Sequence, residues 1–361
     1  RGRLKLLDRR RAFLGVHFPE AGESFTDLSS FHTAAHQRLI FEELFFLEVG
    51  LELKRRRLRQ RQGIAFELND KVREALKKIL PFHPTGAQKR VLKEIAQDMQ
   101  QPAPMRRLLQ GDVGSGKTIV ALQAAVIAME NGYQVAFMAP TEILAEQHLR
   151  TLSAWGAKIG IRVEPLLGRL TTPVRTQILE DLSKGKIDLL VGTHALLESD
   201  VRFKSLGFVV VDEQHRFGVR QRATIRSKAL EPDVLVMSAT PIPRTLALTL
   251  YGDLDVSILN ELPAGRKPIE TRLYAEKDRE KVYEEVRVAV SQGQQAYIVY
   301  PLVEASEQLE AKDATSMEKE LSAGPFRDFR VDLIHGQMPS QQKEEVMTKF
   351  VRGEIDVLVS T

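Results

Sequence analysis

The sequence predicts an α/β protein in which two parallel-sheet units follow an N-terminal helical connector. Two observations lead to this prediction. Apolar runs alternate with amphipathic helical stretches over residues 82–262, and a shorter series of the same kind follows over 263–361. A glycine-rich loop also stands between the first apolar run of the series and the helix after it. We therefore expect three parts: 1–81, 82–262 and 263–361.

The connector contains a long helical pattern from Thr33 to Arg61. Leucine and phenylalanine side chains form one face of this pattern, and glutamates such as Glu42 and Glu48 form the other. We expect the apolar face to pack on a neighbouring element, with its aromatic side chains as core contacts.

Each of the two later units has its own series of expected strands. In the first unit they are 105–109, 135–139, 163–167, 189–192, 208–211 and 234–238. In the second they are 271–274, 296–300, 331–335 and 356–360. The segment 260–268 has the turn residues of a linker, and 304–324 is polar enough to predict a mobile loop with a short stretch of helix. No internal sequence repeat is evident.

Composition limits the class of protein. Apolar residues make up 43% and charged residues 28% of the 361, as is ordinary for a globular protein. No apolar run reaches the ~18 residues of a membrane span, so a membrane partner is not expected. The chain has no cysteine, which excludes disulfides and thiolate metal sites and fits a reducing cytoplasm.

Positive charge is concentrated at the N-terminus. Residues 1–62 contain 13 Lys and Arg against 8 Asp and Glu, whereas the other 299 residues contain 39 against 40. The centre of this surplus is the run from Lys54 to Arg61. Such a run suits a phosphate backbone, and it equally suits the solvated C-terminal end of a helix. The two interpretations are compatible.

The run from Gly111 to Thr118 fits G-x-x-x-x-G-K-[ST], the P-loop. Glycines allow backbone N–H groups to surround phosphate oxygens, and the following helix directs its positive end at the same anion. Lys117 is expected to reach the β- and γ-phosphates of ATP, and the Thr118 hydroxyl to ligate Mg²⁺. The other nucleotide-binding residues expected in the loop are Gly111, Gly114, Ser115 and Gly116.

Two acidic residues follow the apolar run 208–211, which predicts a buried strand of a parallel sheet. Ligands of open α/β sheets bind at the carboxyl ends of strands, so Asp212 and Glu213 are expected to face the phosphates. Asp212 is placed to hold Mg²⁺. Glu213 is placed to orient and deprotonate the attacking water.

Several segments resemble the motifs of superfamily 2 helicases in order and spacing: the P-loop, 140–148, 191–197, 212–215 and 238–241. The finer similarity is to the bacterial RecG family of branched-DNA helicases. It rests on 82–88, 212–219, 238–247 and 262–266, and the whole resemblance covers roughly residues 33–361. It implies two RecA-like units with ATP in the cleft between them.

The resemblance also implies roles for further residues. Phe82 and Gln88 would bind the adenine, Gln88 through the donor and acceptor of its amide. His215 would couple the nucleotide site to the second unit, and Ser238 and Thr240 would bond to the acidic motif and sense the nucleotide. Loop residues at strand ends would contact DNA phosphates without reading sequence. These are Thr141, Glu142, Thr193, His194 and His335.

The function implied by the resemblance is an ATP- and Mg²⁺-dependent translocase on double-stranded DNA. It would remodel branched DNA, namely stalled replication forks and Holliday junctions, in recombination and repair. A monomer in the bacterial cytoplasm is expected, with single-stranded-DNA-binding protein as a candidate partner. The chain starts at Arg1 and stops at Thr361, so we expect a piece that lacks a preceding wedge domain and the later arginine-bearing motifs, and that is only weakly active.

Two alternatives stay open at this stage. One is another superfamily 2 motor, such as a transcription-repair coupling factor, a primosomal helicase or an RNA helicase. The other is a non-catalytic nucleotide- or DNA-binding module. DNA- and RNA-stimulated ATP turnover distinguishes them.

Overall fold

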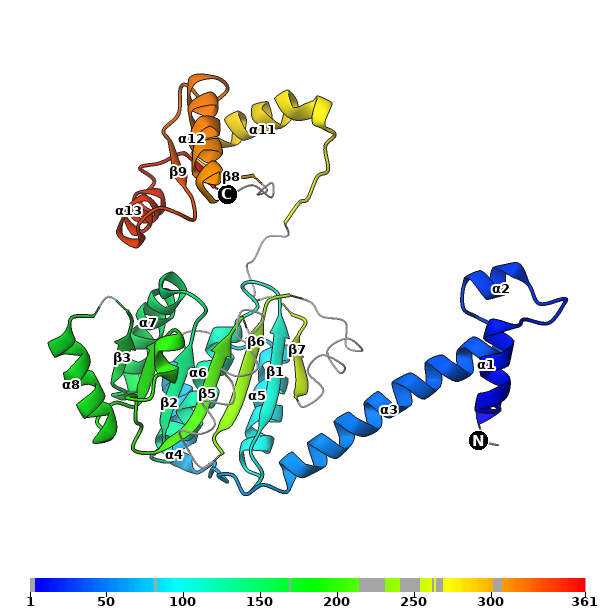
Figure 1. Ribbon diagram of the computed structural model, residues 1–361. Coiled ribbons are helices and arrows are strands. Elements are labelled where there is room, and N and C mark those ends of the chain that lie inside the picture. The colour runs from blue at the N-terminus through cyan, green and yellow to red at the C-terminus, as the bar shows by residue number, and fades with distance from the viewer. Residues whose placement is uncertain are drawn as a thin grey trace. The chain divides into compact units, whose positions relative to one another are not determined.

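Parallel strands form the centre of each of two units, Arg1–Arg266 and Lys267–Thr361 (Figure 1). The computed structural model describes residues 4–80, 83–168, 170–213, 231–240, 254–261, 263, 269–300 and 307–360. The predicted α/β class with two parallel-sheet units is confirmed. None of the described helices is both long and apolar enough to cross a membrane.

The described part of the chain begins with the helices α1 (Arg9–His17), α2 (Phe25–Ser29) and α3 (Ala34–Arg59). The long predicted helix is confirmed as α3. It is tied to α1 near its N-terminal end, where Glu42 pairs with Arg9 at 3.1 Å and with Arg38. Phe45 and Phe46 lie further along α3 and are 49% and 64% exposed, so the expectation that they are core contacts is wrong.

The first unit contains a seven-stranded sheet with the order β3-β4-β2-β5-β6-β1-β7, in which all described pairings are parallel. Its strands are β1 (Arg106–Gly111), β2 (Gln134–Met138), β3 (Val163–Leu166), β4 (Leu189–Gly192), β5 (Leu206–Asp212), β6 (Asp233–Ser238) and β7 (Asp255–Leu259). Its later helices are α4 (Asp70–Ile79), α5 (Gly86–Met99), α6 (Lys117–Glu130), α7 (Glu142–Gly156), α8 (Thr172–Ser183), η2 (Ala157–Ile159) and η3 (His194–Leu197).

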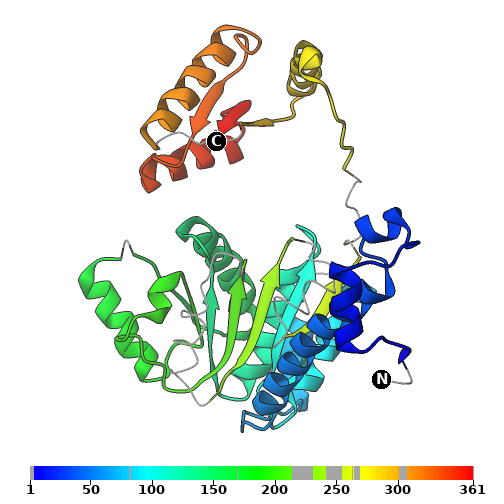
Figure 2. The same cartoon turned by 45° about the vertical axis from the view of Figure 1, so that its right-hand side comes forward.

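Successive strand residues point to opposite faces of this sheet, and each face has its own core. Leu109 packs with residues of α4, α5, α6 and α7, whereas its neighbour Leu108 packs with residues of α8 and η3. Figures 1 and 2 show helices on both sides of the strands. The helix after the P-loop, α6, is buried on all sides from Ile119 to Ala128, as expected for a stretch that is apolar except at Gln123.

The second unit has a three-stranded parallel sheet with the order β8-β10-β9. Its elements are η5 (Glu276–Asp278), α11 (Arg279–Ser291), β8 (Ala296–Val299), α12 (Glu307–Ala323), β9 (Val331–Ile334), α13 (Ser340–Val351) and β10 (Val357–Ser360). The loop expected over 304–324 is wrong, because α12 occupies most of it and buries Leu321 beside Phe326. The strand expected over 271–274 is absent. That segment instead bonds to α11 through Tyr274 and Glu285, at 2.7 Å.

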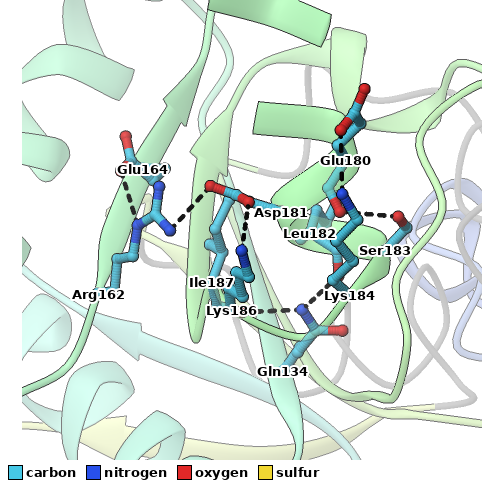
Figure 3. Close-up of polar contacts among 10 residues, drawn as sticks. All are labelled: Gln134, Arg162, Glu164, Glu180, Asp181, Leu182, Ser183, Lys184, Lys186 and Ile187. Carbon is cyan, nitrogen blue, oxygen red and sulfur yellow. Dashed lines mark hydrogen bonds and ion pairs between the residues drawn. The ribbon is translucent and has the colours of Figure 1, made fainter. Parts of the chain in front are cut away.

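One hydrogen-bond arrangement occurs in both units. At the start of β2, the Gln134 amide donates to the Leu182 and Ile187 carbonyls at 2.9 and 2.8 Å (Figure 3). Immediately before β8, the Gln295 amide donates to Phe350 and Ile355 at 2.5 and 2.7 Å. Each glutamine thus connects the end of a helix to the segment just before a strand. The helix and strand are α8 and β4 for Gln134, and α13 and β10 for Gln295.

A second pair of contacts follows the same pattern. The Arg162 N–H donates to Asp188 at 2.8 Å before β3, and the Arg330 N–H donates to Asp356 at 2.8 Å before β9. The strand order β3-β4-β2 corresponds to β9-β10-β8. Residues 182–193 and 350–361 share Gly, Ile-Asp, Leu-Val and Thr at the same positions. The structure therefore reveals an internal repeat that was not evident from the sequence.

Candidate nucleotide site

The P-loop lies between β1 and α6, as its motif predicts. Gly114 and Gly116 have φ values of 81° and 90°, in the left-handed region that favours glycine. A Cβ on Gly116 would lie 2.2 Å from the Gln88 amide nitrogen, so the loop also lacks room for a side chain there. The conformation leaves the first N–H groups of α6 facing the space in front of the loop.

Lys117 begins α6 and turns back over the loop. Its Nζ donates to the carbonyls of Gly111 and Asp112 at 2.7 and 3.1 Å. Burial lowers the pKa of this amine, although the nearby carboxylates of Asp212, Glu213 and Asp112 act in the opposite direction. Beside it, the fully buried Ser115 hydroxyl has no hydrogen-bond partner among the described residues. A cation thus stands beside the position predicted for the phosphates, whereas the Ser115 hydroxyl is enclosed within the protein.

A cavity of about 900 Å³ opens in front of this loop. We call it the P-loop cavity. Six of the residues predicted from the sequence line it: Gly114, Gly116, Lys117, Thr118, Asp212 and Glu213. Two motifs about 95 positions apart in the chain therefore meet at one site, because β1 and β5 both end at the same edge of the parallel sheet.

The two adjacent acidic residues have different hydrogen-bond partners. Asp212 is buried at the end of β5, and its Oδ2 lies 2.7 Å from Nε2 of His148 on α7. Glu213 has a φ of 50°, a strained value for a residue with a side chain. Its Oε1 accepts the Ala239 N–H at 3.2 Å. His148 and Ala239 were not assigned from the sequence, because each contact joins segments far apart along the chain.

Ser238 and Thr240 lie after β6, beside the acidic pair. Their hydroxyls are 2.9 Å from one another, and the Thr240 N–H donates to Ser238 Oγ at 3.2 Å. This segment contacts the acidic motif through the Ala239 N–H, which donates to Glu213. The sensing role of the two hydroxyls stays a prediction.

Gln88 is 1% exposed and lies behind the P-loop. Its side-chain oxygen accepts the Thr85 N–H at 3.0 Å, and its amide nitrogen donates to the Ser115 carbonyl at 2.9 Å. The first contact completes a capping box at the start of α5. Gln88 thus supports the P-loop backbone, and its contact with adenine stays a prediction. Phe82 and His215 lie outside the described residues.

Four of the predicted DNA-contacting residues lie at the same strand edge as the cavity. Thr141 caps α7 after β2, accepting the Leu144 N–H at 3.3 Å, and Glu142 accepts the Gly168 N–H at 2.8 Å. Thr193 is buried after β4, and His194 is exposed at the start of η3. The fifth residue, His335, follows β9 in the second unit.

Family models match both units. The model described as DEAD/DEAH box helicase matches residues 85–249, and the one described as Helicase conserved C-terminal domain matches residues 278–361. The ATP-dependent DNA helicase RecG of Synechocystis sp. is 46% identical over 362 residues, covering 100% of this chain and 43% of that protein. RecG of Thermotoga maritima is 46% identical over 357 residues, covering 99% and 45%.

A solved structure of RecG bound to a three-way DNA junction has a TM-score of 0.79 and 42% identity over 100% of this chain. The chain belongs to the RecG family. It spans about half the length of the family members it matches, since it covers 46% of the chain in that structure. The predicted family resemblance is confirmed.

Proposed function

We propose that the chain is the motor part of an ATP-dependent DNA helicase that remodels branched DNA in recombination and repair. The meeting of the P-loop and the acidic pair in one cavity of a RecG-family chain carries this proposal. The related protein bound to a three-way junction supports branched duplex DNA as the substrate.

ATP fits the P-loop cavity chemically. Lys117 donates to two neutral carbonyl oxygens, and a phosphate would replace them because its oxygens carry a charge opposite to that of the ammonium. Glu213, whose carboxylate is oriented by Ala239, is the base for the attacking water.

Mg²⁺ fits the oxygen groups of this site. Thr118 and Asp212 both line the cavity, and hydroxyl and carboxylate oxygens are ligands that Mg²⁺ takes alongside substrate phosphates. The described residues hold no group of three or more metal-ligating side chains, so nucleotide oxygens and water complete the proposed shell. When bound, the ion supplies positive charge that offsets the charge of the transferred phosphoryl group.

DNA phosphates are proposed to lie along the same strand edge, at Thr141, Glu142, Thr193 and His194. We further propose a monomer in the cytoplasm, with single-stranded-DNA-binding protein as a candidate partner. Hydrolysis would move the DNA-contacting loops in steps along the duplex.

Steady-state ATP turnover tests the proposal with branched DNA, linear duplex and RNA as activators. Branched DNA is expected to stimulate most. Lys117→Ala should weaken ATP binding by about 1.5–3 kcal/mol, because it removes charge-assisted hydrogen bonds. Lys158→Ala, an exposed lysine of the same unit, is the matched control. Equal stimulation by RNA would point to an RNA motor, and ATP binding without turnover would point to a non-catalytic module.

A further inference from the structure

His148 is a partly buried residue of the P-loop cavity that neither the P-loop nor the acidic motif includes. It lies on α7, and its ring is 4.6 Å from that of Phe137 on β2. Its Nε2 is 2.7 Å from Oδ2 of Asp212. The His148 and Asp212 side chains are each 11% exposed.

This geometry fixes one oxygen of the Asp212 carboxylate. A carboxylate oxygen accepts, so Nε2 of His148 carries the proton and donates it. Phe137 restricts the ring on one side, and the low exposure of both side chains reduces competition from water. The carboxylate therefore has a defined orientation before any ligand binds, with Oδ1 as the remaining oxygen.

We propose that His148 is a positioning residue that orients Asp212 for the divalent ion bound with the nucleotide. The proposal rests on the proposed function, in which Asp212 is a Mg²⁺ ligand. Residues that hydrogen-bond a metal ligand fix its orientation, and their loss typically lowers metal affinity or activity about 10- to 100-fold.

The placement of His148 on α7 gives this contact a second consequence. The helix starts at Thr141 and Glu142, two of the residues proposed to contact DNA, and His148 lies about 10 Å further along it at 1.5 Å per residue. One rigid helix thus carries both the proposed phosphate contacts and the group that holds the proposed metal ligand.

Three substitutions of His148 test the hydrogen-bond donor and the aromatic ring separately. His148→Phe keeps an aromatic ring on Phe137 and removes the donor. His148→Gln keeps a donor, because the glutamine amide nitrogen extends about as far as Nε2, and removes the ring. His148→Asn retains an amide that is one carbon too short to reach Asp212. Asp212→Asn serves as the reference for loss of the ligand itself.

The measurement is binding of a fluorescent ATP analogue to the full chain during titration with Mg²⁺, starting from chelated metal. His148→Phe and His148→Asn should raise the half-saturating Mg²⁺ concentration about 10-fold or more. Their binding of the analogue without Mg²⁺, and their melting temperatures, should match those of the parent. His148→Gln should stay close to the parent. If the Phe variant is unstable, the Asn and Gln variants make the same comparison.

An unchanged Mg²⁺ dependence in the Phe and Asn variants would overturn the proposal. So would a Gln variant as impaired as the Phe variant, because the ring rather than the hydrogen bond would then matter. Lys117→Ala distinguishes failure of the positioning role of His148 from failure of the proposed function. If it weakens analogue binding as expected while the His148 variants bind Mg²⁺ normally, only the positioning role fails. If it has no effect, the proposed function fails.

Discussion

Glu213 and Asp212 are adjacent carboxylates with separate surroundings. Asp212 is held by a histidine on α7, and Glu213 by a backbone N–H after β6. The strained backbone of Glu213 turns its side chain away from the course of β5 toward that N–H. These surroundings support different chemical roles for the two residues, one in binding a metal and one in accepting a proton.

Glu213→Gln should leave ATP binding intact and lower turnover about 10²- to 10⁴-fold, because an amide retains the acceptor for Ala239 but cannot take a proton. Parallel measurements of ATP affinity and of steady-state turnover check this. Glu276→Gln, at an exposed acid of the second unit, is the control. Hydrolysis at the parent rate by Glu213→Gln would exclude Glu213 as the general base.

Asp233 is a fully buried carboxyl at the start of β6, outside the P-loop cavity. Its Oδ1 accepts the Met105 N–H at 2.6 Å, and its Oδ2 has no partner among the described residues. Burial raises its pKa well above the ordinary value. The folded state therefore binds this proton more tightly than the unfolded state does.

This difference makes the Asp233 contribution to folding stability fall as pH rises above the unfolded-state pKa of about 3.9, until the folded-state pKa is passed. Asp233→Asn keeps the acceptor for Met105 and removes the titration. The variant should lose less stability than the parent between acidic and neutral pH, as measured by urea unfolding across this range. The exposed Asp70→Asn is the control. Identical pH slopes for parent and variant would contradict the prediction.

At the scale of elements, the sequence predicted the strands that local hydrophobicity alone makes distinctive. The apolar runs that became β2 and β5 are buried along their whole length, so local hydrophobicity was sufficient. The edge strand β7 was not predicted, because it begins with Asp255 and only alternate residues are buried. The sequence of α12 predicts mostly loop, since only a few apolar residues such as Leu321 reach the small core of the second unit.

The glutamine contacts repeated in the two units allow a matched prediction. Gln134 is 5% exposed, so Gln134→Ala should destabilise the first unit by about 1–3 kcal/mol by leaving buried carbonyls without donors. Gln295 is exposed, so Gln295→Ala should cost less, about 0.5–1.5 kcal/mol. Chemical unfolding of both variants, with Gln294→Ala as control, provides the comparison. Equal effects at the two sites would show that burial does not set the cost.

Across the whole molecule, the sequence predicted the two-unit organisation and most of the candidate site, because the P-loop and the acidic pair are continuous segments. The repeat between the units was not predicted, since the identical residues of 182–193 and 350–361 are few, and the matching hydrogen bonds of Gln134 and Gln295 follow only from the fold. The contact of His148 could not be predicted for a related reason. Its partner Asp212 is 64 positions away, and only the folding of α7 against the sheet brings them together.

The uneven distribution of charge leads to a prediction for the molecule as a whole. The basic run belongs to the C-terminal part of α3, where cations are also favoured by the helix dipole. Arg56 pairs there with Glu52 at 3.2 Å, and Arg55 lies 3.9 Å from the same carboxylate. These exposed pairs are weak, and a DNA phosphate can replace them.

If the basic run contacts the DNA backbone, changing Lys54, Arg55, Arg56 and Arg57 to Gln should reduce the dependence of DNA affinity on salt. The log–log slope should fall by up to about 0.9 for each lost contact with duplex DNA, because fewer counterions are released on binding. The control changes four cations of α4 to Gln and so removes the same charge elsewhere: Lys71, Arg73, Lys77 and Lys78. Binding measured at several salt concentrations distinguishes a local contact from a net-charge effect. If both quadruple variants flatten the slope equally, net charge alone is responsible, and if neither does, the basic run is a solvated helix end.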